Sequence, residues 1–219
     1  MTAADADVVF CDLDGTIVDS WPGILRCLRV ALPEVGLEHL TDEDIRGFLG
    51  PPLKHTLIGV YGRTEDDVDR FVVKYRSVYF TGGEYEFEVF PGMAELVADL
   101  HASDRPLVLA TAKPIESATR VLREAGLLDC FDAVSGSELD LARQGKAAVL
   151  AHGLELIGAP ATTSAVMIGD RKEDVLGARE HGFATVGVSW GYADDGELAG
   201  AGADHIVSSA ADLRGVLGL

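Results

Sequence analysis

The chain has 219 residues, of which 47% are hydrophobic and 25% are charged, a composition typical of a globular protein and unlike that of a disordered one. Its formal net charge of −18 at pH 7 argues against nucleic-acid polymers and anionic membranes as partners, because both require a basic protein surface. The length fits one full-sized domain, or a domain of about 150 residues that carries a smaller insert.

The N-terminal segment and the cysteines indicate a cytoplasmic protein. The opening MTAADADVVF carries acidic residues where a secretory signal peptide has basic ones, and no apolar run reaches membrane-spanning length. Cys11, Cys27 and Cys130 lack CxxC spacing and are odd in number, so neither disulfides nor a zinc site is indicated. Both a monomer and a homodimer remain open.

Short apolar runs alternate with helical patterns along most of the chain. The runs rich in β-branched residues are 8–13, 107–110, 165–168, 185–188 and 205–207. Between them lie segments with a helical pattern of apolar residues, such as 93–100 and 121–125, and Gly126 ends the second. This alternation predicts an α/β fold with a doubly wound (Rossmann-like) parallel sheet covered by helices on both faces.

One segment, 17–83, interrupts the alternation and contains no convincing strand. Ile24, Leu28, Leu32 and Val35 mark one apolar helical stripe. A Thr64–Asp67 pair is typical of a capping box at the start of a later helix. We therefore expect residues 1–16 and 84–219 to form the α/β core, and residues 17–83 to form an inserted α-helical cap domain.

Two carboxylates, Asp12 and Asp14, directly follow the first predicted strand. Ligands of open α/β sheets bind at the carboxyl ends of strands. Alternation along an extended chain sends both side chains to the same side, where two like charges need a cation or a proton to offset their repulsion. A surface turn that uses Asp14-Gly15 for its geometry is the alternative interpretation.

Two further polar residues occupy corresponding places on later segments. Thr111 ends the strand pattern 107–110, and Pro114 suits the first turn of a helix, so the Thr111 hydroxyl and the helix amides could bind an anion. Lys146 stands at an expected helix start, where its charge opposes the helix dipole unless an anion lies nearby. Taken singly, Thr111 also fits a helix cap and Lys146 a solvated surface residue.

A second acidic pair, Asp170 and Asp174, follows the strand pattern 165–168. Their spacing of one helical turn lets both carboxylates face the same cation, and hard oxygen ligands suit Mg²⁺. The alternative is that Asp170 caps a helix and that Asp174 is a carboxylate in its first turn, stabilised by the helix dipole.

Taken together and in this order, these motifs resemble those of the haloacid dehalogenase-like hydrolases, over almost the whole chain. A helical insert directly after the first motif resembles the subgroup with a helical cap, which includes phosphoglycolate phosphatases. Further strings resemble the bacterial 5′-nucleotidase-like branch of that subgroup; they are 48–53 (FLGPPL), 110–114 (ATAKP), 169–174 (GDRKED) and 190–192 (WGY).

The resemblance implies a phosphoric monoester hydrolase that acts on a small-molecule phosphate ester. Asp12 would attack phosphorus to form an aspartyl-phosphate, and Asp14 would serve as general acid and then general base. Dehalogenases and phosphonatases of this superfamily lack the carboxylate at Asp14, so its presence disfavours those reactions. A phosphomutase of the same fold, a phosphorylatable signalling receiver and a binding module without catalysis are the alternatives.

The resemblance also implies how the other motif residues act. The cofactor would be Mg²⁺, held by the Asp12 carboxylate, the Asp14 backbone carbonyl and Asp170. Asp174 would position a water that binds the metal or would bind at the edge of the site. The phosphoryl oxygens would be bound by Thr111, Ala112 and Lys146.

Substrate specificity is expected to come from the cap. Its best candidates are Arg46, Lys54 and His55, which flank the turn at 50–52. The alternative is that this turn only connects two helices and that its basic residues are solvated. Candidate substrates are nucleoside monophosphates and phosphoglycolate.

Overall fold

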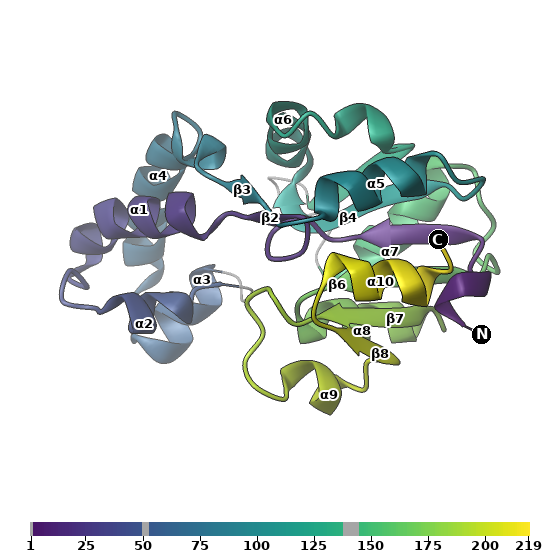
Figure 1. Ribbon diagram of the computed structural model, residues 1–219. Helices are drawn as coiled ribbons and strands as arrows, with labels where there is room; N and C mark the ends of the chain where they lie inside the picture. Colours follow the sequence, from purple (N-terminus) through teal and green to yellow (C-terminus); the bar gives the residue numbers. More distant parts are fainter. Residues whose placement is uncertain (1, 50–52, 138–144) are drawn as a thin grey trace. The chain divides into compact units, whose positions relative to one another are not determined.

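The main sheet of the structure is built around β1 (Val8–Cys11) (Figure 1). All four residues of this strand are buried. The computed structural model describes residues 2–49, 53–137 and 145–219. Six strands pair in the order β5-β4-β1-β6-β7-β8, and every neighbouring pair is parallel. The other five strands are β4 (Leu107–Pro114), β5 (Ala133–Ser137), β6 (Ala165–Gly169), β7 (Ala184–Val188) and β8 (His205–Val207).

The strand order reverses direction at β1, which places the start of the chain at the switch point of the sheet. From β1 the chain adds β4 and β5 on one side and then β6, β7 and β8 on the other. The carboxyl ends of β4, β1 and β6 therefore lie next to one another at one edge of the sheet. In open α/β sheets this is where ligands bind.

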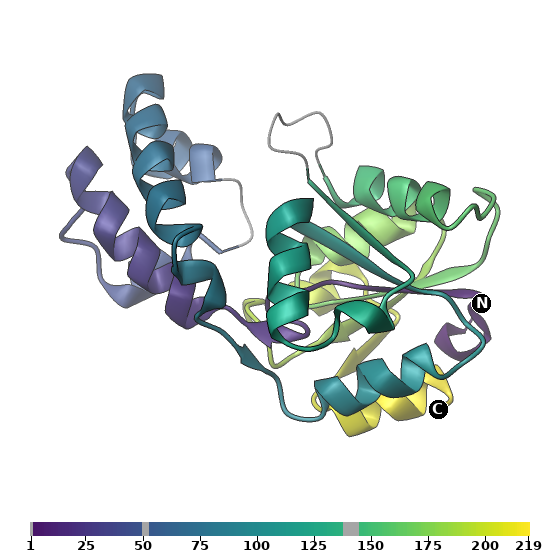
Figure 2. The same cartoon turned by 90° about the horizontal axis from the view of Figure 1, so that it is seen from above.

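Helices cover both faces of this sheet, as expected for central strands such as β1 and β6, which are buried along their whole length. Figure 2 shows α7 and α8 on one face and α5 and α10 on the other. The helices of this unit are α5 (Met93–His101), α6 (Ile115–Glu124), α7 (Lys146–Leu156), α8 (Lys172–Glu180), α9 (Glu197–Ala201) and α10 (Ala210–Leu217).

One core cluster packs α7 and α8 against the sheet. Val8 and Phe10 of β1 point into it, together with Val108 from β4 and Met167 from β6. Phe10 stacks on Phe183 at a ring-centroid separation of 5.9 Å. This packing holds β1 rigidly between its two neighbours, so the residue that follows β1 has a well-defined position.

The chain divides into two compact units, one formed by the residues up to Asp19 with Val89–Leu219, the other by Ser20–Glu88. The expected boundaries, after residue 16 and before residue 84, lie a few residues to the N-terminal side of these divisions. Two short strands, β2 (Val18–Asp19) and β3 (Glu88–Val89), pair as a separate sheet where the chain passes between the units.

The second unit is helical and has its own apolar core. Its helices are α1 (Trp21–Ala31), α2 (Asp42–Arg46), α3 (Leu53–His55) and α4 (Glu65–Tyr79). Leu28 and Leu32 pack with Phe71 in the core cluster of this unit. The capping box predicted for Thr64 and Asp67 is confirmed, since each side chain bonds the other residue's backbone N–H at the start of α4.

The expected fold class is confirmed, with three local corrections. The prediction omitted β5, an edge strand that lacks a continuous apolar run, because its buried residues are Ser135 and Gly136 and its other three residues are half-buried. The segment 17–83 was expected to contain no strand, yet it contains β2, which at two residues is too short to show a period. Finally, β4 does not end before Thr111 but continues to Pro114.

Among the described residues, no helix is both long enough and apolar enough to cross a membrane.

Candidate active site

The site begins at Asp12, the first residue after β1. Its backbone N–H donates to the carbonyl of Ile168 in β6 at 2.9 Å, which continues the parallel pairing one residue beyond the strand. Only 9% of Asp12 is exposed to solvent. The sheet therefore holds a carboxylate, almost fully out of water, at the carboxyl end of its central strand.

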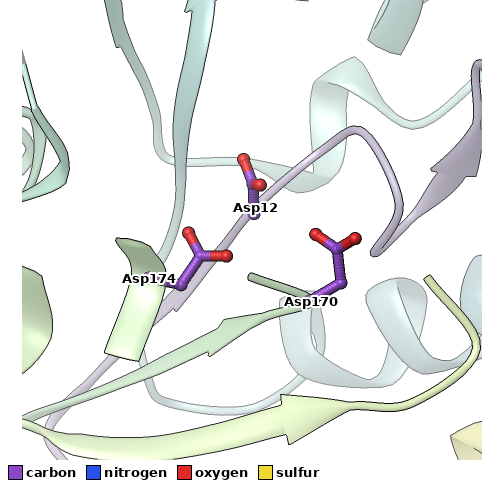
Figure 3. A group of neighbouring side chains, drawn as sticks. All are labelled: Asp12, Asp170 and Asp174. Carbon is purple, nitrogen blue, oxygen red and sulfur yellow. The ribbon is translucent and has the colours of Figure 1, made fainter. Parts of the chain in front are cut away.

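Three carboxylates come together at this position. Asp12, Asp170 and Asp174 are all buried, and each offers one oxygen within 4.8 Å of the other two. Asp170 directly follows β6, and Asp174 lies in the first turn of α8. Figure 3 shows the three side chains converging from these separate segments. The structure thus brings three of the predicted site residues together.

Backbone amides orient two of these carboxylates. The N–H of Tyr192 donates to Asp170 Oδ2 at 2.7 Å, and the N–H of Arg171 donates to Asp174 Oδ2 at 3.0 Å. The second contact makes Asp174 part of the N-terminal cap of α8. Asp170 Oδ1 is buried and has no hydrogen-bond partner among the described residues. A buried acceptor without a partner is unfavourable unless a cation or a ligand satisfies it.

Glycines allow the close approach around Asp170. A Cβ placed on Gly15 would lie 2.1 Å from Asp170 Oδ2, and one on Gly191 would lie 2.4 Å from the same atom. Gly15 also has a φ of +80°, which other residues adopt only with strain. A side chain at either of these two glycine positions would collide with Asp170.

Lys146 supplies a buried positive charge to the acidic group. It is the first residue of α7, and its Nζ donates to the carbonyl of Ala110 at 2.8 Å. The same Nζ lies 3.1 Å from Asp12 Oδ1 and 2.6 Å from Asp174 Oδ1. A lysine at the start of a helix is disfavoured by the helix dipole, and here two nearby carboxylates compensate for this.

The electrostatics of this group favour an additional cation. Burial raises the pKa of Asp12 to about 6, and Asp174 and Asp14 add to the rise, while Lys146 opposes it. Burial also raises the pKa of Asp170 well above its ordinary value, with contributions from Asp174 and Asp12. Burial disfavours the charged form of Lys146, but Asp12 and Asp174 outweigh it and raise the pKa of this lysine. Three ionised carboxylates beside one ammonium leave an excess of negative charge.

The donor set fits a hard divalent cation. All three candidate ligands are carboxylate oxygens, the type that Mg²⁺ and Ca²⁺ prefer, and the group contains no Cys or His. Asp170 Oδ1, which has no hydrogen-bond partner among the described residues, is available as an oxygen ligand for a metal. A divalent cation would offset both the excess negative charge and the raised carboxyl pKa values of Asp12 and Asp170.

The Asp14 side chain pairs with a different lysine from that of Asp12. Its carboxylate is not a member of the three-residue acidic group but accepts from Lys113 Nζ, at 2.7 Å to Oδ1 and 2.8 Å to Oδ2. The two aspartates remain close enough that Asp14 contributes to the raised pKa of Asp12. Asp12 and Asp14 thus have different partners at the same edge of the sheet.

The predicted phosphate-binding residues of β4 differ in exposure. Thr111 is buried, and its Oγ1 accepts from the N–H of Lys113 at 3.2 Å, while Ala112 is exposed. Pro114, which was expected in the first turn of a helix, is the N-cap of α6, and this helix begins one residue later at Ile115. The amides available near Thr111 therefore belong to an irregular strand end and not to a helix N-terminus.

The predicted specificity residues lie in the helical unit. The Arg46 guanidinium lies over the Trp21 ring, 5.4 Å from its centroid, and Lys54 forms an ion pair with Glu65 at 2.6 Å. His55 ends the short helix α3. The turn at 50–52, which these residues flank, lies outside the described residues.

Lys113 was missed by the sequence analysis, although the string at 110–114 contains it. Its side chain is only 6% exposed, and it contacts a residue of the first motif across the sheet edge. The available signal was a lysine two residues after the strand-end threonine. Lysines are rarely buried without a partner, but the sequence could not tell whether this one was buried.

Comparisons with known proteins decide the family. A family model described as haloacid dehalogenase-like hydrolase matches residues 8–188, which include every residue of the acidic group and Lys146. The chain belongs to the haloacid dehalogenase-like hydrolases. It is therefore an enzyme, and the family resemblance expected from its motifs is confirmed.

Three relatives of this hydrolase illustrate the range of activities found nearby. A 5′-nucleotidase from Pseudomonas aeruginosa is 35% identical over 95% of this chain and 94% of its own length. A phosphoglycolate phosphatase from Caulobacter vibrioides is 31% identical, covering 92% of this chain and 86% of its own. The tyrosine-protein kinase PtkA from Mycobacterium tuberculosis is 36% identical over 84% of this chain, but the match spans only 62% of that protein.

A solved structure supports the same family. The crystal structure of a predicted phosphatase from Clostridium acetobutylicum superimposes with a TM-score of 0.90 at 32% sequence identity, covering 98% of this hydrolase and 99% of that chain.

Proposed function

We propose that this hydrolase is a Mg²⁺-dependent phosphomonoesterase that transfers the phosphoryl group of a small phosphorylated metabolite to Asp12 and then to water. The observation that carries the proposal is the buried group of Asp12, Asp170 and Asp174 beside Lys146 at the carboxyl end of the central strand. Phosphoryl transfer depends mainly on positioning and on offsetting negative charge, and this group is suited to both.

The metal would be held by the side chains of Asp12, Asp170 and Asp174 together with the backbone carbonyl of Asp14. When bound, Mg²⁺ supplies positive charge that lets an anionic nucleophile and an anionic phosphate approach each other. The partnerless Oδ1 of Asp170 and the absence of soft ligands from this group support this assignment.

The protein residues account for both halves of the reaction. An Asp12 oxygen forms a bond to phosphorus as the bond to the leaving oxygen breaks, and the leaving oxygen takes a proton from Asp14. Asp14 then removes a proton from the water that attacks the aspartyl-phosphate, which restores the Asp12 carboxylate. Lys146, Thr111 and the backbone of Ala112 bind the phosphoryl oxygens during both steps.

The names of the relatives suggest two substrate classes, nucleoside 5′-monophosphates and phosphoglycolate. Both are alkyl phosphate monoesters, so the same chemistry at Asp12 serves either one. The proposed specificity residues are Arg46, Lys54 and His55, whose positive or titratable side chains suit an anionic or a polar leaving group.

Two other phosphoryl-transfer activities remain as competing outcomes. A phosphomutase of this fold would return the phosphoryl group to a sugar and release no phosphate. The similarity to PtkA favours tests for a kinase activity as well, in which phosphate would pass from ATP to a tyrosine side chain. Both alternatives also transfer a phosphoryl group, so product analysis must distinguish them.

The test is steady-state release of phosphate from a panel of esters, with and without Mg²⁺. The panel contains p-nitrophenyl phosphate, AMP, IMP, phosphoglycolate and a hexose phosphate, and a separate arm contains ATP with a tyrosine peptide. We expect Mg²⁺-dependent phosphate release for the wild type, its loss in Asp12→Asn, and normal activity in Asp129→Asn. Asp129 is an exposed aspartate of the same unit and serves as the matched control.

Each result leads to a clear decision. Tyrosine phosphorylation or a sugar isomer without phosphate release would replace the phosphatase proposal by the kinase or the mutase. Full activity in Asp12→Asn would remove Asp12 from the role of nucleophile.

A further inference from the structure

The end of β4 is irregular in a way that turns a lysine inward. The register between β4 and β5 shifts between Ala110 and Pro114, and across this stretch Ala112 is exposed while Lys113 is buried. The neighbouring strand approaches closely here, since a Cβ on Gly136 would lie 2.6 Å from the Lys113 carbonyl oxygen. The backbone of Lys113 is therefore fixed from two sides, by Thr111 Oγ1 and by β5.

From this fixed position, Lys113 reaches the first motif. Its Nζ donates to both carboxylate oxygens of Asp14, at 2.7 and 2.8 Å. The side chain of Lys113 is 6% exposed and that of Asp14 is 23% exposed. An ion pair on the protein surface restrains its side chains little, whereas a pair that is shielded from water holds both side chains in one geometry. Contact with both oxygens also restricts rotation of the carboxylate.

Asp14 needs such a restraint because the neighbouring acidic group does not supply one. The carboxylates of Asp12, Asp170 and Asp174 converge without that of Asp14. A metal bound among these three would therefore not hold the Asp14 side chain in place. Proton transfer to a leaving group requires placement within hydrogen-bond reach, and misplacement by about 1 Å can reduce rates by about 100-fold.

We propose that Lys113 is a positioning residue that holds the Asp14 carboxyl group in place for proton transfer to the leaving oxygen. This inference rests on the proposed function. As the bond between phosphorus and the leaving oxygen breaks, its electron pair stays on that oxygen, which takes the proton from Asp14. Lys113 neither gives nor takes a proton in this step.

The role predicts a dependence on the leaving group. p-Nitrophenolate leaves without a proton, whereas the alkoxide of an alkyl ester must be protonated as it leaves. Loss of the correct Asp14 position should therefore slow the hydrolysis of alkyl phosphates much more than that of p-nitrophenyl phosphate. Loss of a phosphate-binding or purely structural residue would slow both esters alike.

The experiment measures kcat/KM, which covers the reaction up to phosphoryl transfer, for p-nitrophenyl phosphate and for whichever of AMP, IMP and phosphoglycolate the wild type hydrolyses fastest. The variants are Lys113→Met, Lys113→Arg, Asp14→Asn and the double variant Lys113→Met/Asp14→Asn. Lys74→Met in α4 is the control for the loss of a lysine elsewhere. Thermal unfolding of each variant is recorded alongside.

In Lys113→Met we expect a loss of about 100-fold on the alkyl ester but less than about 10-fold on p-nitrophenyl phosphate, within the range contributed by general acid catalysis. Lys113→Arg should recover part of the alkyl-ester rate. In the double variant, loss of Lys113 should add little to the loss caused by Asp14→Asn, because both changes remove one interaction. If Lys113→Met alone folds poorly, the double variant removes both charges and gives the same comparison with Asp14→Asn.

Three results would overturn the inference. They are equal losses on both esters in Lys113→Met, an unchanged rate in that variant, and a double variant whose losses multiply. A wild type that releases phosphate from none of the esters would overturn the proposed function and the role of Lys113 together. An active wild type with equal losses would overturn the role of Lys113 alone.

Discussion

Lys146 Nζ lies 2.6 Å from Asp174 Oδ1, in a place where the side chains of both residues are at most 4% exposed. The lysine begins α7 and the aspartate lies in the first turn of α8, so the contact joins two helices that pack against each other. Asp12 Oδ1 lies 3.1 Å from the same ammonium. One buried cation thus links the strand end and both helix starts that make up the acidic group.

Replacement of Lys146 should therefore affect both stability and catalysis. In Lys146→Met, Asp12 and Asp174 lose their buried counter-charge, and breaking a buried pair in this way lowers the free energy of unfolding by about 3–5 kcal/mol. Loss of a charge that binds the phosphoryl oxygens should lower kcat/KM by about 100- to 1,000-fold. Urea unfolding and phosphate release measure the two effects. Lys74→Met serves as the control, and activity of Lys146→Met within a few-fold of wild type would contradict the role.

Stabilisation by Mg²⁺ should depend on pH. Burial raises the pKa of Asp12 to about 6 from an ordinary value of about 3.9, so between these values the folded metal-free protein keeps a proton that the unfolded chain loses. This contribution to the stability of the metal-free protein is therefore present at low pH and is lost as the pH rises through that window. Since Mg²⁺ binds the ionised form, the rise in Tm that it produces should be small at about pH 5 and larger at about pH 7.5.

The measurement is thermal unfolding with Mg²⁺ and with EDTA across this pH range. Asp129→Asn should keep the wild-type pH dependence. An equal Mg²⁺-induced shift at both ends of the range would show that proton and metal do not compete for the acidic group.

Substitution of Gly191 should disturb Asp170. A Cβ at this position would lie 2.3 Å from the Gly15 carbonyl oxygen and 2.4 Å from atoms of Asp170, so Gly191→Ala must move one of the two loops. Overpacking of this kind costs about 1–3 kcal/mol, and displacement of Asp170 should also weaken Mg²⁺ binding. The Mg²⁺ concentration needed for half-maximal activity measures the second effect.

The matched control is Gly200→Ala, in α9, where a Cβ would meet no atom within 4 Å. This substitution should leave the Mg²⁺ requirement unchanged and raise the free energy of unfolding by about 0.5–1 kcal/mol, because alanine favours a helix more than glycine does. A normal Mg²⁺ requirement in Gly191→Ala would show that the loop adapts without moving Asp170.

The capping box of α4 should contribute to the stability of the helical unit. Thr64→Ala removes the acceptor for the Asp67 N–H and should lower the free energy of unfolding by about 1 kcal/mol. Hydrogen bonds from Thr64 lower the pKa of Asp67, so the contribution of this carboxylate is present above its unfolded pKa and is lost as the pH falls toward the folded one. Denaturation at neutral and acidic pH, with Asp69→Asn as the control, tests both statements.

The sequence alone was sufficient to predict the core fold and the members of the acidic group. Strands such as β1 and β6 are buried on both faces, so they appear as continuous apolar runs, and the residues that follow them had to lie at one edge of a parallel sheet. Asp12 and Asp170 were predicted for this reason, and Asp174 because it lies one helical turn after Asp170. The irregular elements escaped, because β2 is too short to show a period and β5 is an edge strand without an apolar run.

Which partner each charged group takes was decided only by the tertiary structure. Sequence spacing placed Asp12 and Asp14 on the same side of the chain, but it could not show that Lys146 would face the first and Lys113 the second. The Lys113–Asp14 contact joins residues 99 positions apart, and the Lys146–Asp12 contact spans a still longer separation. A register shift at the end of β4 accompanies the inward turn of Lys113. Local pattern determines where a side chain leaves the sheet, whereas burial and long-range packing determine which charge it meets.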